Sequence, residues 1–430
     1  MHDILNMARK VVDEAEIFWV KGKEFPVAFK ANKFYTAEKK DFEGIGIRVI
    51  KKGRLGFAYT TNMKTVKDII EYAKNSAEFG EPAHFEFPSE IRSKSVRTYC
   101  KSIDKISTEE VKEKGLSIIR EIIKKEPDVK VEIKFSRSTG TVRIMNTKGL
   151  NISYKKTSVS TYMDIFLIID GSFNWFFKMK TSQKKIFINK MDVKELLKNI
   201  RYAKKVVPIE PGKMNVIIMP SVMPVLLRSL TMGVNGKLVQ KGSSPLKDKK
   251  GKRILDKNVS IYDDALLKDG IASRPFDDEG IATKKIPLFK NGILKNFLFD
   301  LQTAGIMGTR STGSATRSYS EMPSPGVSNI VVDPGDWSVQ DMIKDINNGI
   351  IVYAVLGGGQ SNLLAGDFSF NVSLGFKIEN GRIKGRVKNT MIAGNVYDAM
   401  SNIAGIGKRL EGVRSFYIPA FYFKSLNVVG

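Results

Sequence analysis

The side chains that most often carry catalysis are scarce in this chain of 430 residues. It has two histidines, His2 and His84, and a single cysteine, Cys100. A His-Glu-x-x-His zinc site needs two histidines one helical turn apart, and a Ser-His-Asp triad needs a histidine beside its serine. The two histidines lie far apart in the sequence, so any mechanism that requires a histidine cluster is excluded. The lone cysteine excludes a disulfide framework.

Nucleotide-binding motifs are absent as well. No Gly-Lys pair is followed by serine or threonine, as a P-loop requires, and Gly44-Ile45-Gly46 lacks the third glycine of a dinucleotide fingerprint. Three polar segments remain as candidate sites: residues 276–280, 308–320 and 365–369. The first has three consecutive carboxylates, which can bind a cation or form an acidic turn. The second can receive a ligand backbone or be a loop, and the third leads into a long strand.

The positive charge of the chain raises nucleic acid as a partner, but its distribution argues against it. The formal net charge is +25, from 70 Lys+Arg and 45 Asp+Glu. Residues 1–200 hold 39 of these cations against 26 carboxylates, which leaves 31 against 19 for the rest of the chain. An excess spread so evenly is typical of a solvated surface rather than of a binding stripe. The charge distribution therefore argues against nucleic acid as the main partner, and nucleic-acid binding is kept only as an alternative function.

No segment of the sequence has the roughly 20 uninterrupted apolar residues that a membrane-spanning helix needs. Charged residues or prolines interrupt the two most apolar stretches, Met214–Val234 and Met163–Phe177. The first residues of the chain are charged and contain no apolar signal core. We therefore expect no membrane partner and a cytoplasmic location.

The elements that would position these segments change character near the middle of the chain. Apolar spacing predicts helices over residues 2–16 and 65–79, and the capping box at Ser107–Glu110 predicts a helix to about residue 125. Beyond the linker Pro208–Gly212, Asn291-Gly292 predicts a hairpin, and alternation from Phe368 to Ile378 predicts a long antiparallel strand. The prediction is an α+β fold, with a mixed helix and strand domain at 1–205 and a mainly antiparallel β domain at 206–430.

Several segments taken together carry a resemblance to a known family. The chain resembles the TldD/PmbA (TldD/TldE) family in the order and content of these motifs: Gly44–Val49, Gly56–Ala58, Phe276–Gly280, Asn291-Gly292, Ser311–Gly313, Gly366–Ser369, Glu379–Gly381 and Ile392–Asn395. The resemblance covers nearly the whole chain. It implies a complex of two homologous subunits, in which TldD has a His-Glu-x-x-x-His zinc helix and PmbA, also called TldE, lacks it.

The helix that would hold zinc corresponds to Val225–Gly233 in this sequence. Arg228 and Ser229 stand where the first histidine and the glutamate would be, and Met232 or Gly233 replaces the second histidine. An arginine neither ligates zinc nor loses its charge. The chain therefore resembles the PmbA/TldE subunit, and the resemblance implies no metal and no cofactor here, with zinc in the partner.

The resemblance gives the leading functional hypothesis. It implies a non-zinc subunit that pairs with a TldD-like zinc peptidase and encloses peptide or unfolded-protein substrates, with a homodimer as a further assembly. No residue is expected to be catalytic. The residues that we expect at the substrate or partner are Arg228, Asp277, Asp278, Glu279, Arg310, Ser311, Thr312 and Asp367. For Arg228, a position on the exposed face of a helix is an equally good interpretation.

The three carboxylates at 277–279 are expected to order the rim, and the strand from Phe368 to offer an edge for an extended peptide. One rival function is a basic DNA-associated regulator, which the family's older name, modulator of gyrase, suggests. The other is an independent hydrolase that uses the three carboxylates with a metal.

Overall fold

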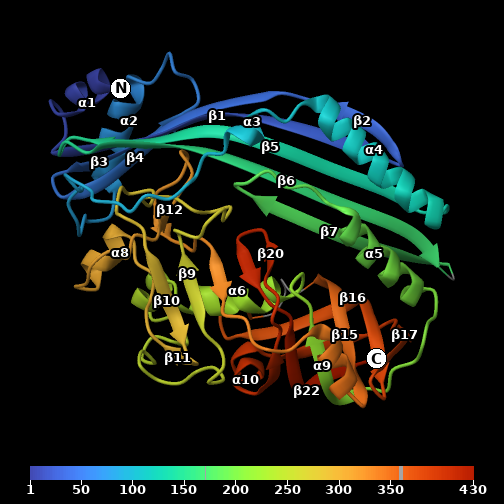
Figure 1. Cartoon of the computed structure of the whole chain (residues 1–430). Helices are drawn as coiled ribbons and strands as arrows, with labels where there is room; N and C mark the ends of the chain where they lie inside the picture. Colours follow the sequence, from blue (N-terminus) through green and yellow to red (C-terminus); the bar gives the residue numbers. More distant parts are fainter. Residues whose placement is uncertain (170, 358–361) are drawn as a thin grey trace.

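The N-terminal half of the chain forms a single antiparallel sheet. The computed structural model describes residues 1–169, 171–357 and 362–430. The strands of this sheet run in the order β4-β3-β1-β5-β6-β7, and β2 pairs with β1. Their bounds are β1 Glu14–Lys30, β2 Lys33–Ala37, β3 Lys40–Lys51, β4 Arg54–Thr60, β5 Lys130–Asn146, β6 Asn151–Ile169 and β7 Ser172–Ser182. Figure 1 shows β1, β5, β6 and β7 as long strands that lie over the C-terminal half.

The helices of this half are α1 His2–Ala8, α2 Asp68–Ser76, α3 Lys101–Asp104, α4 Thr108–Lys125 and α5 Lys190–Ala203, and a 3-10 turn covers Ala77–Phe79. The helix predicted over 2–16 is wrong beyond Ala8, because Glu14 already begins β1. Ala15 fits the helical spacing, but Ala15 and Ile17 also alternate into the core of a strand that pairs with both β3 and β5. Ser107 caps α4 as predicted.

The C-terminal half contains two further sheets and a small strand pair. One sheet has the order β11-β10-β9-β14-β21-β20 and β12 pairs with β13. Its strands are β9 Ile261–Asp264, β10 Lys285–Lys290, β11 Ile293–Leu294, β14 Ile330–Val332, β20 Glu411–Val413 and β21 Phe416–Ile418, and the pair is β12 Ala315–Thr316 with β13 Ser324–Pro325. The predicted hairpin is confirmed, since Asn291 and Gly292 have φ values of 49° and 74° between β10 and β11.

The last sheet closes on itself. Its order is β15-β8-β22-β18-β16-β17, β15 also pairs with β16, and β19 pairs with β22. The bounds are β8 Gly212–Ile218, β15 Asn348–Gly357, β16 Asp367–Glu379, β17 Arg382–Arg386, β18 Met391–Asn395, β19 Ile403–Ile406 and β22 Phe421–Val429. The predicted long strand is β16, and its antiparallel pairing is confirmed. The predicted free edge is wrong, because β15 pairs along one side of β16 while β17 and β18 pair along the other.

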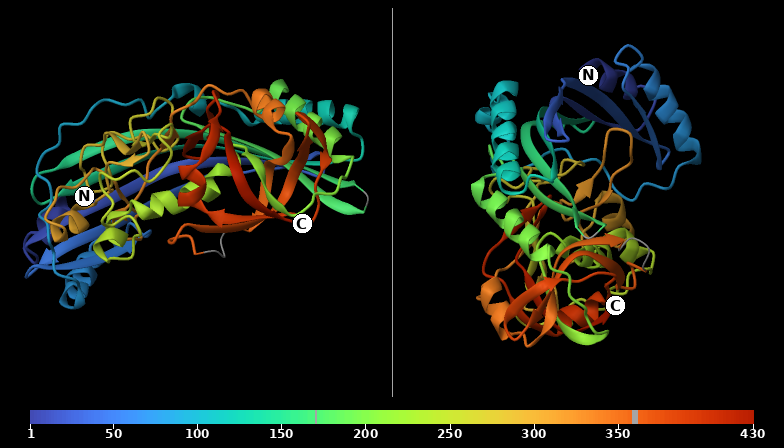
Figure 2. Two further views of the ribbon diagram at one scale, coloured as in Figure 1. Left: turned by 90° about the horizontal axis from the view of Figure 1, so that it is seen from below. Right: turned by 90° about the vertical axis from the view of Figure 1, so that its right-hand side faces the viewer.

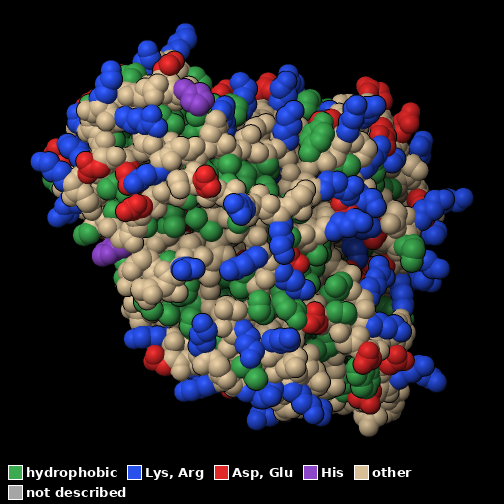
Figure 3. Space-filling view, turned by 60° about the vertical axis from the view of Figure 1, so that its left-hand side comes forward, with side chains coloured by type: hydrophobic (Ala, Val, Ile, Leu, Met, Phe, Trp, Pro, Cys, Tyr) green, Lys and Arg blue, Asp and Glu red, His purple; other side chains and the backbone are tan. Residues whose placement is uncertain are grey.

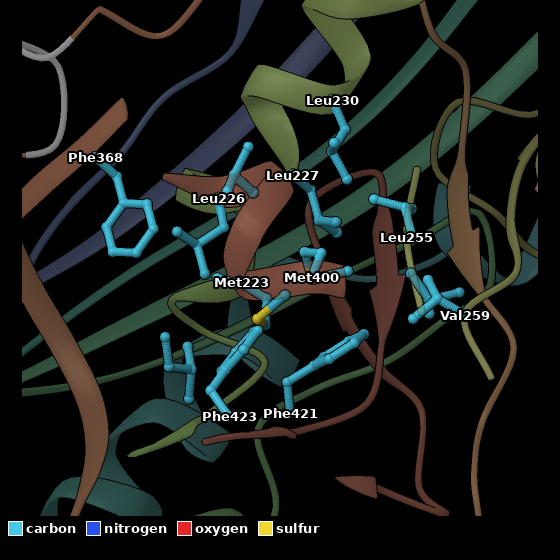
Figure 4. Close-up of a cluster of buried hydrophobic side chains, with 14 of the residues drawn as sticks. Met223, Leu226, Leu227, Leu230, Leu255, Val259, Phe368, Met400, Phe421 and Phe423 are labelled. Atoms are coloured by element: carbon cyan, nitrogen blue, oxygen red, sulfur yellow. The ribbon is translucent and has the colours of Figure 1, made fainter. Parts of the chain in front are cut away.

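The helices of the C-terminal half are α6 Met223–Gly233, α7 Gly236–Gln240, α8 Leu301–Ile306, α9 Val339–Asp345 and α10 Val396–Ser401. Helix α6 supplies Leu226, Leu227 and Leu230 to a core that it shares with Phe421 and Phe423 of β22 (Figure 4). The apolar face of α6 thus fixes its rotation. Arg228 is left on the exposed side of the helix.

A second core joins the two halves of the chain. One continuous cluster contains Val131 and Ile165 of the long sheet together with Ile351, Phe376 and Tyr422 of the closed sheet. The views in Figure 2 show the long sheet stacked against the C-terminal half. The fold is therefore α+β with antiparallel sheets, as predicted. The predicted boundary between residues 205 and 206 falls between α5 and β8 and stays a prediction.

Candidate functional site

The acidic segment 277–279 is built as a tight turn. Asp277 Oδ1 accepts hydrogen bonds from the backbone N–H groups of Glu279 at 3.0 Å and Ile281 at 2.9 Å, and Gly280 takes φ +80° to close the turn. Asp277 Oδ2 accepts from the N–H of Ala315 at 2.9 Å. Asp277 is fully buried, and burial raises the pKa of its carboxyl to about 6. Its hydrogen bonds hold the turn to β12.

The middle carboxylate of the segment bridges two arginines. Asp278 Oδ2 lies 2.9 Å from Nη1 of Arg274 and accepts a 3.0 Å hydrogen bond from the backbone N–H of Arg317. Arg274 also donates from Nη2 to the Ala315 carbonyl at 3.0 Å. A charge that is buried without a partner is costly, so these contacts are what make the burial of Asp278 tolerable.

The third carboxylate reaches across to the N-terminal sheet. Glu279 Oε1 lies 2.5 Å from Nη1 of Arg48 on β3, and Glu279 Oε2 accepts from the N–H of Leu301 at 2.6 Å. Burial raises the pKa of the Glu279 carboxyl to about 7, although the Arg48 guanidinium opposes this rise. Arg48 and Glu279 are 1% and 0% exposed, so water has almost no access to the pair.

Two more residues extend this contact into a network. Glu16 on β1 is the cross-strand partner of Arg48 on β3, and its Oε1 lies 3.1 Å from Arg48 Nη2 and 2.7 Å from Arg317 Nη2. We call Glu16, Arg48, Arg274, Asp277, Asp278, Glu279 and Arg317 the junction network. Figure 1 shows β12, next to Arg317, lying close beneath the long sheet. The network fastens the loops of the C-terminal half to that sheet.

A cleft of about 640 Å³ opens beside the network. Its walls come from both halves, with Arg48 and His84 on one side and Lys237, Asp300 and Gln302 on the other. The His84 backbone N–H donates to Gln302 Oε1 at 3.0 Å, which ties the turn of His84 to α8. The cleft is large enough for several residues of an extended peptide.

The hydroxyl segment 311–312 is hydrogen-bonded to Phe299, which precedes the cleft residue Asp300. The Phe299 carbonyl accepts from the N–H of Thr312 at 3.1 Å and from Ser311 Oγ at 3.2 Å, while Thr312 Oγ1 accepts from the Phe299 N–H at 2.8 Å. Arg310 is exposed next to them. The structure therefore brings the segments 277–279 and 311–312 into one loop cluster.

Arg228 and Asp367 lie elsewhere. Asp367 begins β16, is exposed, and accepts a 3.0 Å hydrogen bond from Asn395 Nδ2. Tyr397, two residues after Asn395, packs closely against both Gly366 and Gly233 at the end of α6. Arg228 is exposed on the same helix, where it makes no side-chain hydrogen bond or ion pair within the described ranges. Tyr397 thus joins the end of α6 to the start of β16, and both Arg228 and Asp367 lie outside the loop cluster.

Sequence reasoning missed Glu16 and Arg48, the residues on which the network depends. Each interrupts an apolar run, Ala15-Glu16-Ile17 and Ile47-Arg48-Val49. Opposite charges, each set within a short apolar run of one of two neighbouring strands, are a usable signal of a buried cross-strand pair. Arg274 and Arg317 had no comparable signal, because both lie in irregular segments.

The residues of α6 do not fit the zinc ion that the resemblance associates with this helix. Arg228 is a cation, Ser229 is buried, and Met232 offers only a thioether. Zinc in proteins is held by thiolate, imidazole or carboxylate groups. Across residues 1–169, 171–357 and 362–430, no group of three His, Cys, Asp or Glu side chains could hold a metal ion. Over the same ranges, no helix is both long and apolar enough to cross a membrane.

Comparisons with known proteins agree with this architecture. Two proteins of Methanocaldococcus jannaschii are similar over nearly the full length. One is uncharacterised, at 27% identity over 93% of this chain and 92% of its own. The other is a metalloprotease, at 26% identity over 94% and 91%. The crystal structure of TldE from Thermococcus kodakarensis has the same fold, with a TM-score of 0.94 and 24% identity over 100% of both chains.

Family models match three consecutive segments. Residues 15–78 match PmbA/TldA metallopeptidase domain 1, residues 101–179 match the central domain, and residues 211–430 match the C-terminal domain. The first two segments lie on the one long sheet, and the third covers the closed sheet and the loops of the junction network. Because these matches follow one another in order and the third alone spans more than half of the residues, this chain belongs to the PmbA/TldD metallopeptidase family.

Proposed function

We propose that this chain is a non-zinc, TldE-type subunit of a cytoplasmic metallopeptidase complex. In this proposal a TldD-like zinc subunit performs hydrolysis, and this chain helps to enclose peptide or unfolded-protein substrates. The observation that carries the proposal is the donor set of α6, where the resemblance puts Arg228 and Ser229 in place of the first histidine and the glutamate of the zinc helix. The likeness to TldE of Thermococcus kodakarensis supports it.

The cleft of about 640 Å³ is the region we assign to an extended peptide. It lies between the two halves, and its lining mixes cations such as Lys237 and Lys241 with apolar groups such as Phe57 and Ile306. Asp277, Asp278 and Glu279 act from inside the fold because they are buried, and Glu279 holds the cleft residue Arg48 in place. A direct contact with the peptide falls instead to exposed side chains such as Arg310.

Assembly with the cognate zinc subunit tests this proposal. The two purified chains, mixed at micromolar concentration, should elute together in size-exclusion chromatography with light scattering, and the pair should hydrolyse an unfolded peptide. This chain alone should contain well under one zinc per chain by elemental analysis. Separate elution of two well-folded chains, or stoichiometric zinc in this one, would contradict the proposal. The same run reports whether this chain forms a homodimer.

Arg228 gives the pairing test a point mutation with a matched control. Arg228→Ala removes an exposed cation from α6, and we expect it to lower the peptidase activity of the reconstituted pair severalfold. Lys194→Ala removes an exposed cation from α5 and should leave the rate unchanged. Equal rates for the two variants would show that Arg228 is an ordinary surface residue.

A further inference from the structure

A second cleft, on the other side of the junction network, has the composition of an anion site. It measures about 410 Å³ and lies between the long sheet and the loops of the C-terminal half. Three cations line it, Lys156, Arg274 and Arg317, against one carboxylate, Asp278. We call it the cationic cleft. Its remaining lining is largely apolar: Phe18, Val20, Phe42, Val142, Tyr154, Tyr319 and Val327.

The arginines beside this cleft keep N–H donors that no group of the chain accepts, although their charges are paired. Asp278 is already engaged by Arg274 at 2.9 Å, and the carboxylate of Glu16 takes only Nη2 of Arg317. Over the described residues, Arg274 Nε and Arg317 Nε and Nη1 are buried and have no hydrogen-bond partner. A buried guanidinium normally satisfies its donors. Both arginines nevertheless have an ion-pair partner, so among the described residues that line the cleft Lys156 is the cation without one.

Lys156 is the cation that a ligand can reach. It lies on β6, is half-buried, and within the described ranges forms no ion pair and no side-chain hydrogen bond. Burial lowers the pKa of the Lys156 ammonium, and the neighbouring Arg274 lowers it further. Asp278 opposes this fall, but its carboxylate is already taken by Arg274 and by the backbone N–H of Arg317. A bound anion would raise this pKa again, because its charge stabilises the ammonium form.

The lining also limits what that anion can be. Tyr319 lies against β3, where a Cβ on Gly44 would meet its ring at 2.5 Å, so the wall is held close to the sheet. Phe18 stacks under Arg317, with the guanidinium carbon 4.3 Å from the ring centroid. A bare inorganic ion would leave this apolar surface uncovered. A carboxylate attached to an apolar group matches both the cationic part and the apolar part of the lining.

We propose that the cationic cleft binds the terminal carboxylate of a peptide that ends in an apolar residue. Lys156 would pair with the carboxylate, and the aromatic wall would cover the last side chain. The inference rests on the proposed function, since it assigns to this subunit the recognition of one end of a peptide substrate. It concerns the chain alone, so it can be tested without the zinc subunit.

Calorimetric titration of the purified full-length chain tests the proposal with two matched probes. N-acetyl-L-phenylalanine has the carboxylate and the apolar group, while N-acetyl-L-phenylalaninamide has the same apolar group without the charge. We expect the acid to bind at least about tenfold more tightly than the amide, as a charge-assisted hydrogen bond provides. Equal binding of the two, or no binding of the acid at millimolar concentration, would overturn the proposal.

A pair of adjacent lysines supplies the variant and its control. Lys156→Gln should reduce the affinity for the acid at least about tenfold and leave the weak affinity for the amide unchanged. Lys155→Gln should have no effect, because neighbouring strand residues face opposite sides of the sheet and Lys155 is exposed. Loss of acid binding in both variants alike would also count against the proposal.

Inorganic phosphate distinguishes a peptide carboxylate from a free anion. Phosphate should compete with the acid only weakly, because it covers none of the aromatic wall. If phosphate binds to the wild-type chain more tightly than the acid does, the cleft is a phosphate site and the assignment to peptides is wrong. Failure of the subunits to assemble would leave the acid and amide result intact, so the two proposals fail separately.

Discussion

At the scale of single residues, the charges that matter most are those hidden from water. Glu16 and Arg48 face each other across β1 and β3, and both are at most 1% exposed. Moving a charge out of water costs several kcal/mol, which its partners must offset. Arg48 has such partners on both sides, Glu16 in its own sheet and Glu279 in the loop of the other half.

Replacing Arg48 should therefore be severely destabilising. Arg48→Met keeps much of the volume but leaves Glu16 and Glu279 buried with weaker compensation, which typically costs about 3–5 kcal/mol. We expect urea denaturation to show a loss of that order in the free energy of unfolding. Arg120→Met on α4, where the arginine is exposed, should stay within about 0.5 kcal/mol of wild type. A small effect of Arg48→Met would show that the network contributes little net stability.

Asp263 on β9 predicts a specific pH dependence. Its Oδ1 accepts from the N–H of Ser328 at 2.7 Å and from its Oγ at 2.5 Å, yet burial raises the pKa of the carboxyl to about 6. The folded state thus binds a proton that the unfolded state has lost. This contribution to stability is fully present below about pH 4 and is lost as pH rises toward 6, by roughly 3 kcal/mol.

Comparison with Asp263→Asn isolates this effect. The variant cannot ionise, so between pH 4 and 7 the wild type should lose roughly 3 kcal/mol more of its unfolding free energy than the variant does. Asp336→Asn, at an exposed position, provides the control. Parallel pH profiles for wild type and Asp263→Asn would show that the folded carboxyl titrates normally.

At the scale of elements, local chemistry predicted what is local and failed where the neighbours are distant in sequence. Ser107 accepts from the Glu110 N–H as its position predicts, and Asn291-Gly292 forms its hairpin. The glutamate half of the predicted capping box differs, since Glu110 pairs with Lys114 and Lys185. A distant lysine competes for that carboxylate, and no local pattern reveals it.

The position of β16 illustrates the same limit. Its alternation predicts a strand with one buried face, and that is confirmed. Alternation says nothing about how many strands flank it, so the closed ring that removes its free edge was not predictable. The segment 277–279 is similar: three carboxylates before a glycine predict a turn, but their burial depends on Arg48, Arg274 and the backbone of β12.

At the scale of the whole molecule, two properties are distributed rather than local. Lysine and arginine side chains are scattered over the face shown in Figure 3, among carboxylates and apolar groups. Such a surface gives, at most, weak nucleic-acid binding that salt removes. The contacts that hold the two halves together are distributed as well, because the second core and the junction network both extend from the N-terminal sheet to the C-terminal half.

That shared core makes a prediction about cooperativity. If residues 1–205 and 206–430 were independent domains, each would unfold at its own denaturant concentration. Because the long sheet and the closed sheet share one buried cluster, opening either half exposes the apolar surface of the other. We therefore expect one transition.

Two variants can report on it, one that keeps only Trp19 on β1 and one that keeps only Trp337 beside Tyr422, with phenylalanine at the other tryptophan positions. In urea, the fluorescence midpoints of the two variants should coincide after correction for any shift in their far-UV circular dichroism midpoints. A Trp19 signal that changes well before the Trp337 signal would show that the halves are separate folding units, joined by their contacts but not dependent on them.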